Sequence, residues 1–585
     1  MEDSDYFIPK PDEEMIANAF EAVRRYTASG TKQAAAKWHL IDWKRATRIV
    51  KQLQTRIVKA VKMQKWKRVR SLQRLLTHST SAKVLSIRRV SENTGSRTAG
   101  IDGEKWDSAA KKQQATAQLT AKGYKAQAVR RIYIPKSNGK QRPLGIPTMK
   151  DRAMQALHLL GLEPISETLA DHNSYGFRPY RSCADAITKC HRLLSKKVSP
   201  TWILEGDIKG CFDNIAHDWL LENIPMNKRI LDQWLKSGYL EKRQLFSTES
   251  GTPQGSVISP TLANMVLDGL QDAIDEALDI RRRDKYRTYK NPHKIHLVRY
   301  ADDFIVTASS KEVLEQQVKP AIQSFLIKRG LELSKDKTFI THIDEGFDFL
   351  GKNIRKYKGK LIIKPSKKNV QTFLRNIQQT IRQHRTCKTL LLIYRLNDMI
   401  RGWAMYHRMD NSKQTFQYVD ARIWWMLWKW AIRRHPNKNK GWVKQRYYRK
   451  QGNRNWTLFD YDSHHNIVPI FYASSIPIQY HSLIRANANP YDPNDEMYFE
   501  QRHDRVMRDK FKGRTRLTML YNHQKGICPV CRLKITEQTG WHTHHIIPKY
   551  LGGKSVFDNL VLLHPVCHQQ VHSNANSFAA AACRK

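Results

Sequence analysis

The stretch that most constrains the fold runs from Ile295 to Ala308 and reads Ile-His-Leu-Val-Arg-Tyr-Ala-Asp-Asp-Phe-Ile-Val-Thr-Ala. Two apolar runs rich in β-branched residues flank Asp302 and Asp303, which predicts two short strands joined by a turn that carries both carboxylates. Adjacent anions at the rim of a sheet repel each other, and Mg²⁺, which prefers hard oxygen ligands, would relieve that repulsion. A solvated Asp-Asp turn is the alternative, because Asp is common in turns.

A second acidic strand upstream favours the metal-binding interpretation. Residues 201–213 again read as a strand that ends at a carboxylate, Asp207. If the two strands lie side by side, Asp207, Asp302 and Asp303 converge at one sheet edge, where three carboxylates can hold two divalent ions for nucleotidyl transfer. The sequence Tyr300-Ala301-Asp302-Asp303 resembles the most specific signature of reverse transcriptases. The order of the flanking motifs resembles the reverse transcriptases encoded by group II introns.

The charge balance indicates a polyanionic partner. The 585 residues include 101 Lys and Arg against 53 Asp and Glu, a formal net charge of +48. A charge this large would make a compact protein repel itself unless a polyanion such as nucleic acid is its normal partner. A ribosomal protein would share the charge, but seldom this length or the 15 Trp. The chain is too long for one core, so several domains are expected.

Cysteine usage and hydropathy favour a protein that works inside the cell. Five of the eight Cys are scattered, whereas Cys528, Cys531 and Cys567 group in a pattern typical of metal ligands. A reducing compartment is therefore expected, either the bacterial cytoplasm with its nucleoid or an organellar matrix or stroma. The sequence contains no apolar run of membrane-spanning length. Its acidic start lacks the features of a signal peptide, and no membrane partner is expected.

Basic helical patterns open the chain. Residues 1–35 read as a leader with one short helix between Glu13 and Tyr26. Residues 36–110 read as basic amphipathic helices that resemble the RNA-binding N-terminal extension of this family. Solvated helix faces are the alternative for these basic residues.

Residues 111–360 resemble the fingers and palm of a reverse transcriptase, the right-hand polymerase fold with an antiparallel sheet. Two β-rich runs joined through Ser-Asn-Gly139 predict a hairpin. Lys136 and Arg142 on this hairpin are candidates for contact with the incoming triphosphate, with plain surface charge as the alternative. The resemblance also implies that Arg178 helps to hold the template or the nucleotide.

Three further features of this region follow the family pattern. Phe212 matches the steric gate, a bulky aromatic that would clash with a 2′-hydroxyl and so favour deoxynucleotides; an ordinary core Phe is the alternative. The run from Gly251 to Pro260 is too rich in Gly and Pro for a regular element. It resembles the loop that positions template and nucleotide, which includes Pro253, Gln254 and Gly255. Lys337 matches a lysine that protonates the departing pyrophosphate or neutralises its charge.

After the palm, residues 361–450 interleave aromatic and basic residues at helical spacing. They resemble the α-helical thumb and maturase region called domain X, which binds the parent intron RNA; Arg401-Gly402-Trp403 and Tyr406 are the clearest match. More than half of the Trp here are expected in the core, and the rest could stack on bases. Residues 451–512 look irregular and are interpreted as a linker and DNA-binding region.

Residues 513–575 carry the second strong pattern, followed by a tail at 576–585. The order of Cys, His and Asn residues in this segment resembles an HNH or ββα-metal endonuclease. The residues are Cys528, Cys531, His544, His545, Asn559, His564, Cys567, His568 and His572. By this resemblance, Cys528, Cys531, His564 and Cys567 would bind a structural Zn²⁺, which accepts mixed sulfur and nitrogen ligands. The family more often has Cys at the position of His564.

A separate nuclease centre is expected beside the zinc ligands. His568 and His572 are four residues apart, so they share one helix face and can share one metal. His544 would be the third ligand of this ion, Mg²⁺ or a similar divalent metal. His545 would be the general base that activates water, and Asn559 would orient it through its carbonyl oxygen. The metal would stabilise the scissile phosphate and the leaving 3′-oxygen.

Together these resemblances imply a multidomain α+β protein with reverse transcriptase, maturase and HNH endonuclease activities. It would bind its parent intron RNA, assist splicing, nick target DNA, and extend the new 3′-hydroxyl with dNTPs on the RNA template. The intact motifs favour this interpretation over a splicing-only RNA-binding cofactor with unused enzymatic sites. The Trp-rich region argues against a third candidate, a bacterial reverse transcriptase of another kind with an acquired nuclease.

Overall fold

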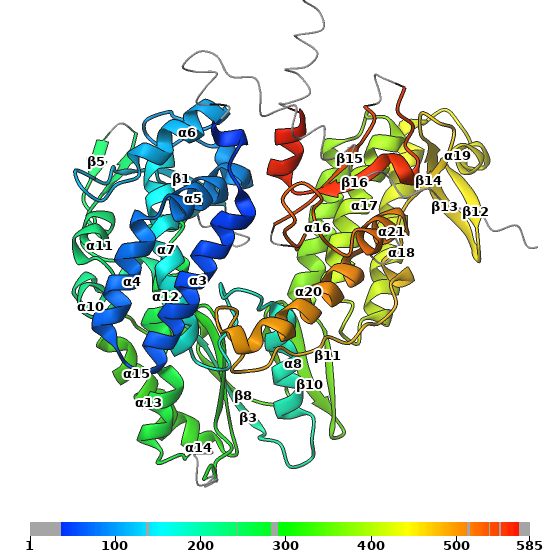
Figure 1. The fold of residues 1–585 in the computed structure, drawn as a ribbon. Helices are drawn as coiled ribbons and strands as arrows, with labels where there is room; N and C mark the ends of the chain where they lie inside the picture. Colours follow the sequence, from blue (N-terminus) through cyan, green and yellow to red (C-terminus); the bar gives the residue numbers. More distant parts are fainter. Residues whose placement is uncertain are drawn as a thin grey trace, which may run out of the picture.

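The computed structural model describes residues 35, 37–135, 139, 141–242, 244–281, 290–511, 515–537, 539–548 and 552–572. The expected leader helix between Glu13 and Tyr26 and the candidate Lys136 lie outside these residues and stay predictions. The helices of residues 43–118 and those of residues 367–447 stand on opposite sides of the molecule, with strands toward the bottom between them (Figure 1). None of the described helices is long and apolar enough to cross a bilayer.

Basic amphipathic helices form the first unit, as expected. They are α3 (Trp43–Lys62), α4 (Trp66–His78), α5 (Thr80–Glu92) and α6 (Ala109–Gln118), with the short turn η2 (Thr94–Arg97) before α6. On α3, apolar residues three and four apart, such as Val50, Leu53 and Ile57, are buried. This face packs on the long helix α7 (Met149–Leu169), so the Lys and Arg of the other face stay at the surface.

A small sheet in the order β2–β1–β4–β5 makes up the fingers. Its strands are β1 (Val129–Pro135), β2 (Gln141–Ile146), β4 (Tyr239–Glu241) and β5 (Gln244–Phe246). Strands β1 and β2 are antiparallel, with Pro135 opposite Gln141, so the predicted hairpin is confirmed.

The central sheet has the order β6–β7–β3–β8 and is entirely antiparallel. Its strands are β3 (Trp202–Asp207), β6 (His296–Tyr300), β7 (Asp303–Ala308) and β8 (Phe339–His342). The middle strands are buried along most of their length because helices cover the sheet. The helices around it are α8 (Cys183–Leu194), α9 (Cys211–Asn214), α10 (His217–Asn223), α11 (Lys228–Leu235), α12 (Ser259–Leu267), α13 (Leu270–Ala277), α14 (Lys311–Val313), η3 (Leu314–Val318), α15 (Lys319–Ile327) and η4 (Lys335–Lys337).

A three-stranded antiparallel sheet, β9 (Phe347–Phe349), β10 (Lys352–Tyr357) and β11 (Lys360–Pro365), leads into the thumb. The thumb helices are α16 (Lys367–Gln383), α17 (Thr389–Tyr406), α18 (Lys413–Arg434) and α19 (Lys440–Tyr447). Trp428 and Trp430 are buried in the thumb core, and Trp403 and Trp424 pack against it. Trp425 is 54% exposed, so most of these Trp serve packing, as expected.

The expected irregularity of residues 451–512 is wrong. Strands β12 (Tyr448–Gln451), β13 (Arg454–Tyr461) and β14 (Ile467–Pro469) form an antiparallel sheet on the thumb, and α20 (Glu496–Phe511) is a helix of 16 residues. Short turns, η5 (Ala473–Ser475) and η6 (Pro493–Asp495), lie between them. The sequence signal is weak because α20 buries only Phe499, Met507 and Phe511, too few for a clear apolar stripe.

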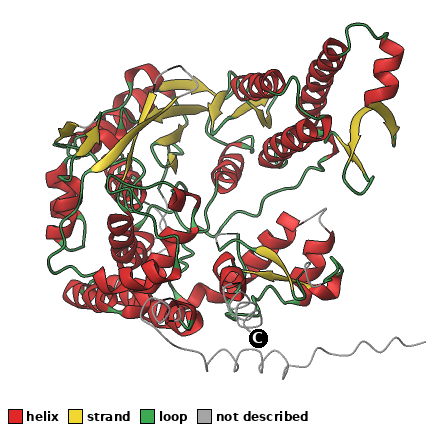
Figure 2. Ribbon diagram, turned by 90° about the horizontal axis from the view of Figure 1, so that it is seen from above, coloured by secondary structure: helices red, strands yellow, loops and turns green. Residues whose placement is uncertain are grey.

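The last unit has the expected ββα arrangement. Helix α21 (Thr515–His523) precedes the antiparallel ribbon of β15 (His542–His545) and β16 (Leu560–Leu563), with η8 (Phe557–Asn559) before β16, and residues 565–572 are helical. Seen from above, this ribbon lies apart from the central sheet among helices (Figure 2). Its apolar core is continuous with that of the N-terminal helices, because Val566 and Cys567 belong to the same cluster as Trp38 and Val90.

Candidate active sites

Three carboxylates meet at one edge of the central sheet. Asp207, the last residue of β3, pairs directly with Asp303, the first residue of β7. Asp302 lies in the turn between β6 and β7, next to Ala301, whose φ of 58° is left-handed and closes the hairpin tightly. The predicted strand–turn–strand unit and the side-by-side placement of the two acidic strands are both present.

The carboxylates act on one another electrostatically. Desolvation and the charges of Asp302 and Asp207 raise the pKa of Asp303 to about 6. Burial also raises the pKa of Asp302, with Asp207 adding to the rise and Arg142 and Lys337 opposing it. Such crowding of anions favours a bound cation, and carboxylate oxygens are ligands that suit Mg²⁺. The residues present therefore fit a magnesium centre.

Lys337 lies beside the carboxylates. Its Nζ donates a hydrogen bond to Asp207 Oδ2 at 2.7 Å, and its side chain is 65% exposed. This contact with Asp207 raises the pKa of Lys337, so the amine stays protonated. A protonated amine beside the carboxylates and open to solvent can meet a departing anion.

The fingers and the glycine-rich loop enclose a cavity of about 350 Å³. Phe212, Pro253 and Gln254 line it, so the structure brings these candidates together. Gly255 has a φ of 103°, and a Cβ there would lie 2.8 Å from Gly145 O, so only glycine permits this approach to strand β2. Arg142 is exposed on the same strand, near enough to act on the charge of Asp302.

The structure does not present Arg178 to this cavity, which corrects the expected contact with template or nucleotide. Its guanidinium forms a bidentate ion pair with Glu167, at 2.8 Å and 2.9 Å, and also donates to the carbonyls of Asp171 and Ser174. Its side chain is 3% exposed. The segment it holds pairs with β6, where Tyr175 N donates to Arg299 O. Arg178 therefore positions the strand that leads into the Asp302 turn.

The predicted zinc ligands form a compact, buried cluster. The ligand atoms of Cys528, Cys531, His564 and Cys567 all lie within 4.8 Å of one another. His564 Nδ1 lies 3.2 Å from Cys531 Sγ, while its Nε2 lies 3.1 Å from Lys534 O. When Nε2–H donates a hydrogen bond to this carbonyl, the tautomer of the imidazole is fixed and Nδ1 is free to bind a metal. These donors fit Zn²⁺, and His564 fits as the fourth ligand.

A second cluster holds the expected nuclease histidines. Nitrogen atoms of His544, His568 and His572 lie within 4.8 Å of one another. Burial, followed by the charges of His568 and His572, lowers the pKa of His544 to about 4. The imidazole is therefore neutral at physiological pH, the form that binds a metal ion. The cluster fits one divalent metal.

The expected contact between Asn559 and His545 is wrong. Asn559 instead holds the loop that follows β15. Its Oδ1 accepts a hydrogen bond from Ile547 N at 2.7 Å, and its Nδ2 donates to the carbonyls of Ile547 and Lys554. His545 Nε2 contacts Ser555 Oγ at 3.0 Å. Ser555 was missed because a serine in a glycine-rich loop carries no motif signal.

Comparisons with known proteins agree with this architecture. Residues 38–119 match the N-terminal domain of reverse transcriptase, and residues 134–354 match reverse transcriptase (RNA-dependent DNA polymerase). Residues 370–448 match the group II intron maturase-specific domain, and residues 528–574 match HNH endonuclease.

Two curated relatives match about half of the chain. Group II intron-encoded protein LtrA of Lactococcus lactis subsp. cremoris is 34% identical over 320 residues, which cover 45% of this chain and 53% of LtrA. Protein YkfC of Escherichia coli K12 is 32% identical over 318 residues, 48% of this chain and 82% of YkfC. The chain thus spans about half the length of LtrA.

Among solved structures, telomerase from Candida albicans in complex with a fragment of telomeric RNA aligns at 12% identity over 55% of this chain and 64% of that chain. Its TM-score of 0.31 supports no structural argument. The assignment rests on the domain matches, their order, and the identity to LtrA and YkfC. The chain belongs to the group II intron-encoded proteins, with reverse transcriptase, maturase and C-terminal HNH endonuclease domains.

Proposed function

We propose that this chain is an RNA-directed DNA polymerase, an intron maturase and a DNA endonuclease that nicks target DNA to prime its own reverse transcription. One observation carries the polymerase assignment: Asp207 faces Asp303 across the β3–β7 ladder, with Asp302 in the adjoining turn. Its partners would be the parent intron RNA, target DNA and dNTPs. It would act inside a bacterial cell or an organelle.

In the polymerase site, Asp207, Asp302 and Asp303 would hold two Mg²⁺ ions. These ions would stabilise the charge on the attacking and the leaving oxygen. Lys337, already protonated beside Asp207, would give its proton to the departing pyrophosphate. Arg142, with Lys136 as a further candidate, would bind the triphosphate. Phe212 would exclude a 2′-hydroxyl, and Pro253, Gln254 and Gly255 would support the base pair.

In the nuclease site, His544, His568 and His572 would hold one divalent metal that stabilises the phosphate and the leaving 3′-oxygen. His545 would take a proton from the attacking water. When its Nε2–H donates to Ser555 Oγ, Nδ1 is left free of a proton and can act as that base. The zinc cluster would hold the ββα unit together, and Asn559 would fix the loop that carries Ser555.

The maturase role rests on the thumb. Its helices expose Tyr394, Tyr418 and Trp425 among basic residues, a surface on which RNA bases could stack. Binding of the parent intron RNA through phosphates and stacked bases would favour its folded form without chemistry by the protein. This role would survive the loss of either active site.

The polymerase proposal is tested by Mg²⁺-dependent extension of a DNA primer on an RNA template by the full chain. Asp302→Asn should reduce extension at least about 100-fold, since even groups beyond the direct ligands cost about 10–100-fold when removed. Asp336→Asn is the matched control, because Asp336 is an exposed carboxylate in the neighbouring turn η4. No extension by the folded, RNA-bound native chain would favour the splicing-only cofactor instead.

A further inference from the structure

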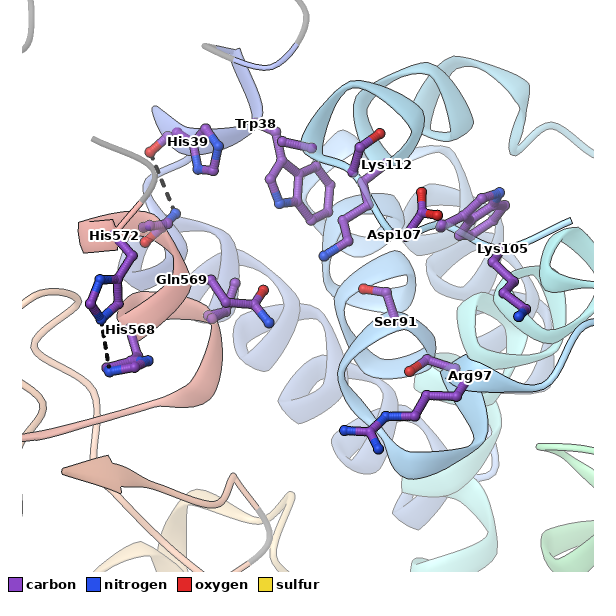
Figure 3. A pocket seen from close by; sticks show the side chains of 16 residues that line it. Trp38, His39, Ser91, Arg97, Lys105, Asp107, Lys112, His568, Gln569 and His572 are labelled. Carbon is purple, nitrogen blue, oxygen red and sulfur yellow. Dashed lines mark hydrogen bonds between the residues drawn. The ribbon is translucent and has the colours of Figure 1, made fainter. Parts of the chain in front are cut away.

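A cavity of about 700 Å³ lies between the nuclease unit and the N-terminal helices. One wall is the last helix, which contributes the candidate metal ligands His568 and His572 to the lining; their rings lie at the side of this helix away from Lys112 and Arg97 (Figure 3). The opposite wall consists of α5, η2, α6 and the segment between η2 and α6, and it includes Arg97, Lys105 and Lys112. We call this cavity the nuclease groove. The two ends of the described chain thus meet at one candidate active site.

The two walls are joined by specific contacts. Gln570 Nε2 donates a hydrogen bond to His39 O at 3.4 Å. Trp38 and Trp106 from the N-terminal side line the groove together with Val566 from the last helix, and all three belong to one apolar cluster. Burial of such side chains is the main force that holds two units together. The N-terminal wall is therefore part of the nuclease surroundings.

Lys112 stands out among the residues of this wall. The residue is 7% exposed, yet its Nζ makes no hydrogen bond or ion pair with any residue that the structure describes. The nearby carboxylates are engaged elsewhere, since Arg88 bonds Glu92 at 3.2 Å and Lys111 bonds Asp107 at 2.9 Å. Its ammonium group points into the open space of the groove (Figure 3).

Most of the Lys112 side chain is buried while its ammonium reaches the groove without a bonded carboxylate, so an anion bound there would stabilise it. Burial lowers the pKa of Lys112, the charges of Glu92 and Asp107 oppose that change, and a phosphate in the groove would oppose it further. Arg97 also reaches toward the groove and is exposed (Figure 3). Asp107 is the one carboxylate among the described lining residues, and Lys111 already pairs with it. The groove therefore favours a negatively charged ligand.

We propose that the nuclease groove seats the phosphodiester backbone of the DNA strand that is cut, with Lys112 and Arg97 binding phosphates next to the scissile one. The inference rests on the proposed nuclease function, because a strand whose phosphate meets His568 and His572 must continue along the walls beside them. Lys112 and Arg97 are then substrate-binding residues contributed by the N-terminal unit. The HNH unit alone would lack half of its substrate site.

The test uses the full chain bound to its intron RNA, which would cover basic surfaces outside the groove. A labelled duplex that carries the ligated exons of this intron is bound in Ca²⁺ over a range of salt concentrations, and nicking is measured in Mg²⁺. Lys112→Met keeps the length of the side chain and removes the charge. Lys122→Met is the matched control, because Lys122 is an exposed lysine just beyond α6 that does not line the groove.

Lys112→Met should weaken DNA binding about tenfold or more, as expected for a lost charge-assisted contact. The slope of log affinity against log salt should fall by about 0.9, the value for one phosphate contact. Lys122→Met should change neither quantity. Arg97→Gln, a change at an exposed residue, serves as a second variant should Lys112→Met lower the thermal unfolding midpoint, and it should reduce the slope similarly.

Unchanged affinity and slope in both Lys112→Met and Arg97→Gln would overturn the inference. Weakened binding of the intron RNA with unchanged binding of DNA would overturn it too, since the groove would then be an RNA site. A native chain that binds DNA in a Lys112-dependent way but nicks no duplex would support the groove and refute the nuclease proposal. The two failures are thus distinguishable.

Discussion

The buried ion cluster around Glu167 gives the sharpest prediction about how the palm hairpin is held. Glu167 accepts a hydrogen bond from Arg178 at each of its oxygens, and Arg181 Nη1 lies 3.6 Å from Oε2. All three side chains are at most 3% exposed. Arg178→Met leaves Arg181 as a substitute partner for Glu167, whereas Glu167→Gln leaves two guanidinium groups without the carboxylate between them.

The expected magnitudes follow from this asymmetry. Removal of one partner from a buried ion pair costs about 3–5 kcal/mol of unfolding free energy. We expect Arg178→Met near the lower value and Glu167→Gln near the upper one. For a unit of this size each kcal/mol lowers the unfolding midpoint by about 2–4 °C. Differential scanning calorimetry should therefore show a fall of roughly 6–12 °C for the first variant and 10–20 °C for the second.

Kinetics separate a positioning role from a nucleotide contact. Because the guanidinium of Arg178 is taken up by Glu167 and by backbone carbonyls, Arg178→Met should lower kcat for primer extension and leave the KM for dNTPs nearly unchanged. Arg142→Met, at an exposed position on the fingers, should do the reverse and leave the midpoint unchanged. An unchanged midpoint with a raised KM in Arg178→Met would refute the reasoning.

Three further predictions concern metals and loop geometry. Because the native pKa of Asp303 is raised to about 6, primer extension at subsaturating Mg²⁺ should fall as the pH drops below about 6. Asp303→Asn should raise the thermal unfolding midpoint at pH 8, and this gain should disappear near pH 4, where the native carboxyl is also neutral. A gain in the unfolding midpoint that persists at pH 4 would contradict this prediction. His564→Ala should release zinc and abolish nicking while primer extension continues. His564→Cys should keep one zinc per chain. Elemental analysis measures the zinc content of both variants, and nicking and extension assays measure their activities. Gly553→Ala should reduce nicking at least about tenfold with unchanged zinc content, because a Cβ there would lie 1.8 Å from Ile547 O; full activity would show that the loop can move aside.

The polymerase carboxylates could be predicted from sequence because the information is local. Asp302 and Asp303 follow one β-branched strand and precede another, and Asp207 ends a third. Burial on both faces leaves such strands few alternative registers, so their ends meet at one edge. The grouping of the candidate metal ligands His568 and His572 was equally predictable, because helical spacing brings them to one face.

The errors arose where distant residues decide the outcome. Whether Arg178 faces the cavity or the core depends on Glu167, and no sequence pattern marks that pairing. Asn559 bonds backbone groups of Ile547 and Lys554 rather than His545, and a bond to backbone groups leaves no pattern in the sequence. The nuclease groove is beyond sequence reasoning, since its walls come from opposite ends of the chain.

The central claim is that one chain makes a primer with its nuclease and extends it with its polymerase. The most direct measurement is the formation of DNA covalently joined to a nicked, labelled target strand by the chain bound to its intron RNA. The account predicts extended product from the native chain, nicked but unextended strand from Asp302→Asn, and neither from His545→Ala. A pre-nicked duplex should restore extension by His545→Ala. Extended product from His545→Ala on an intact duplex would contradict the account.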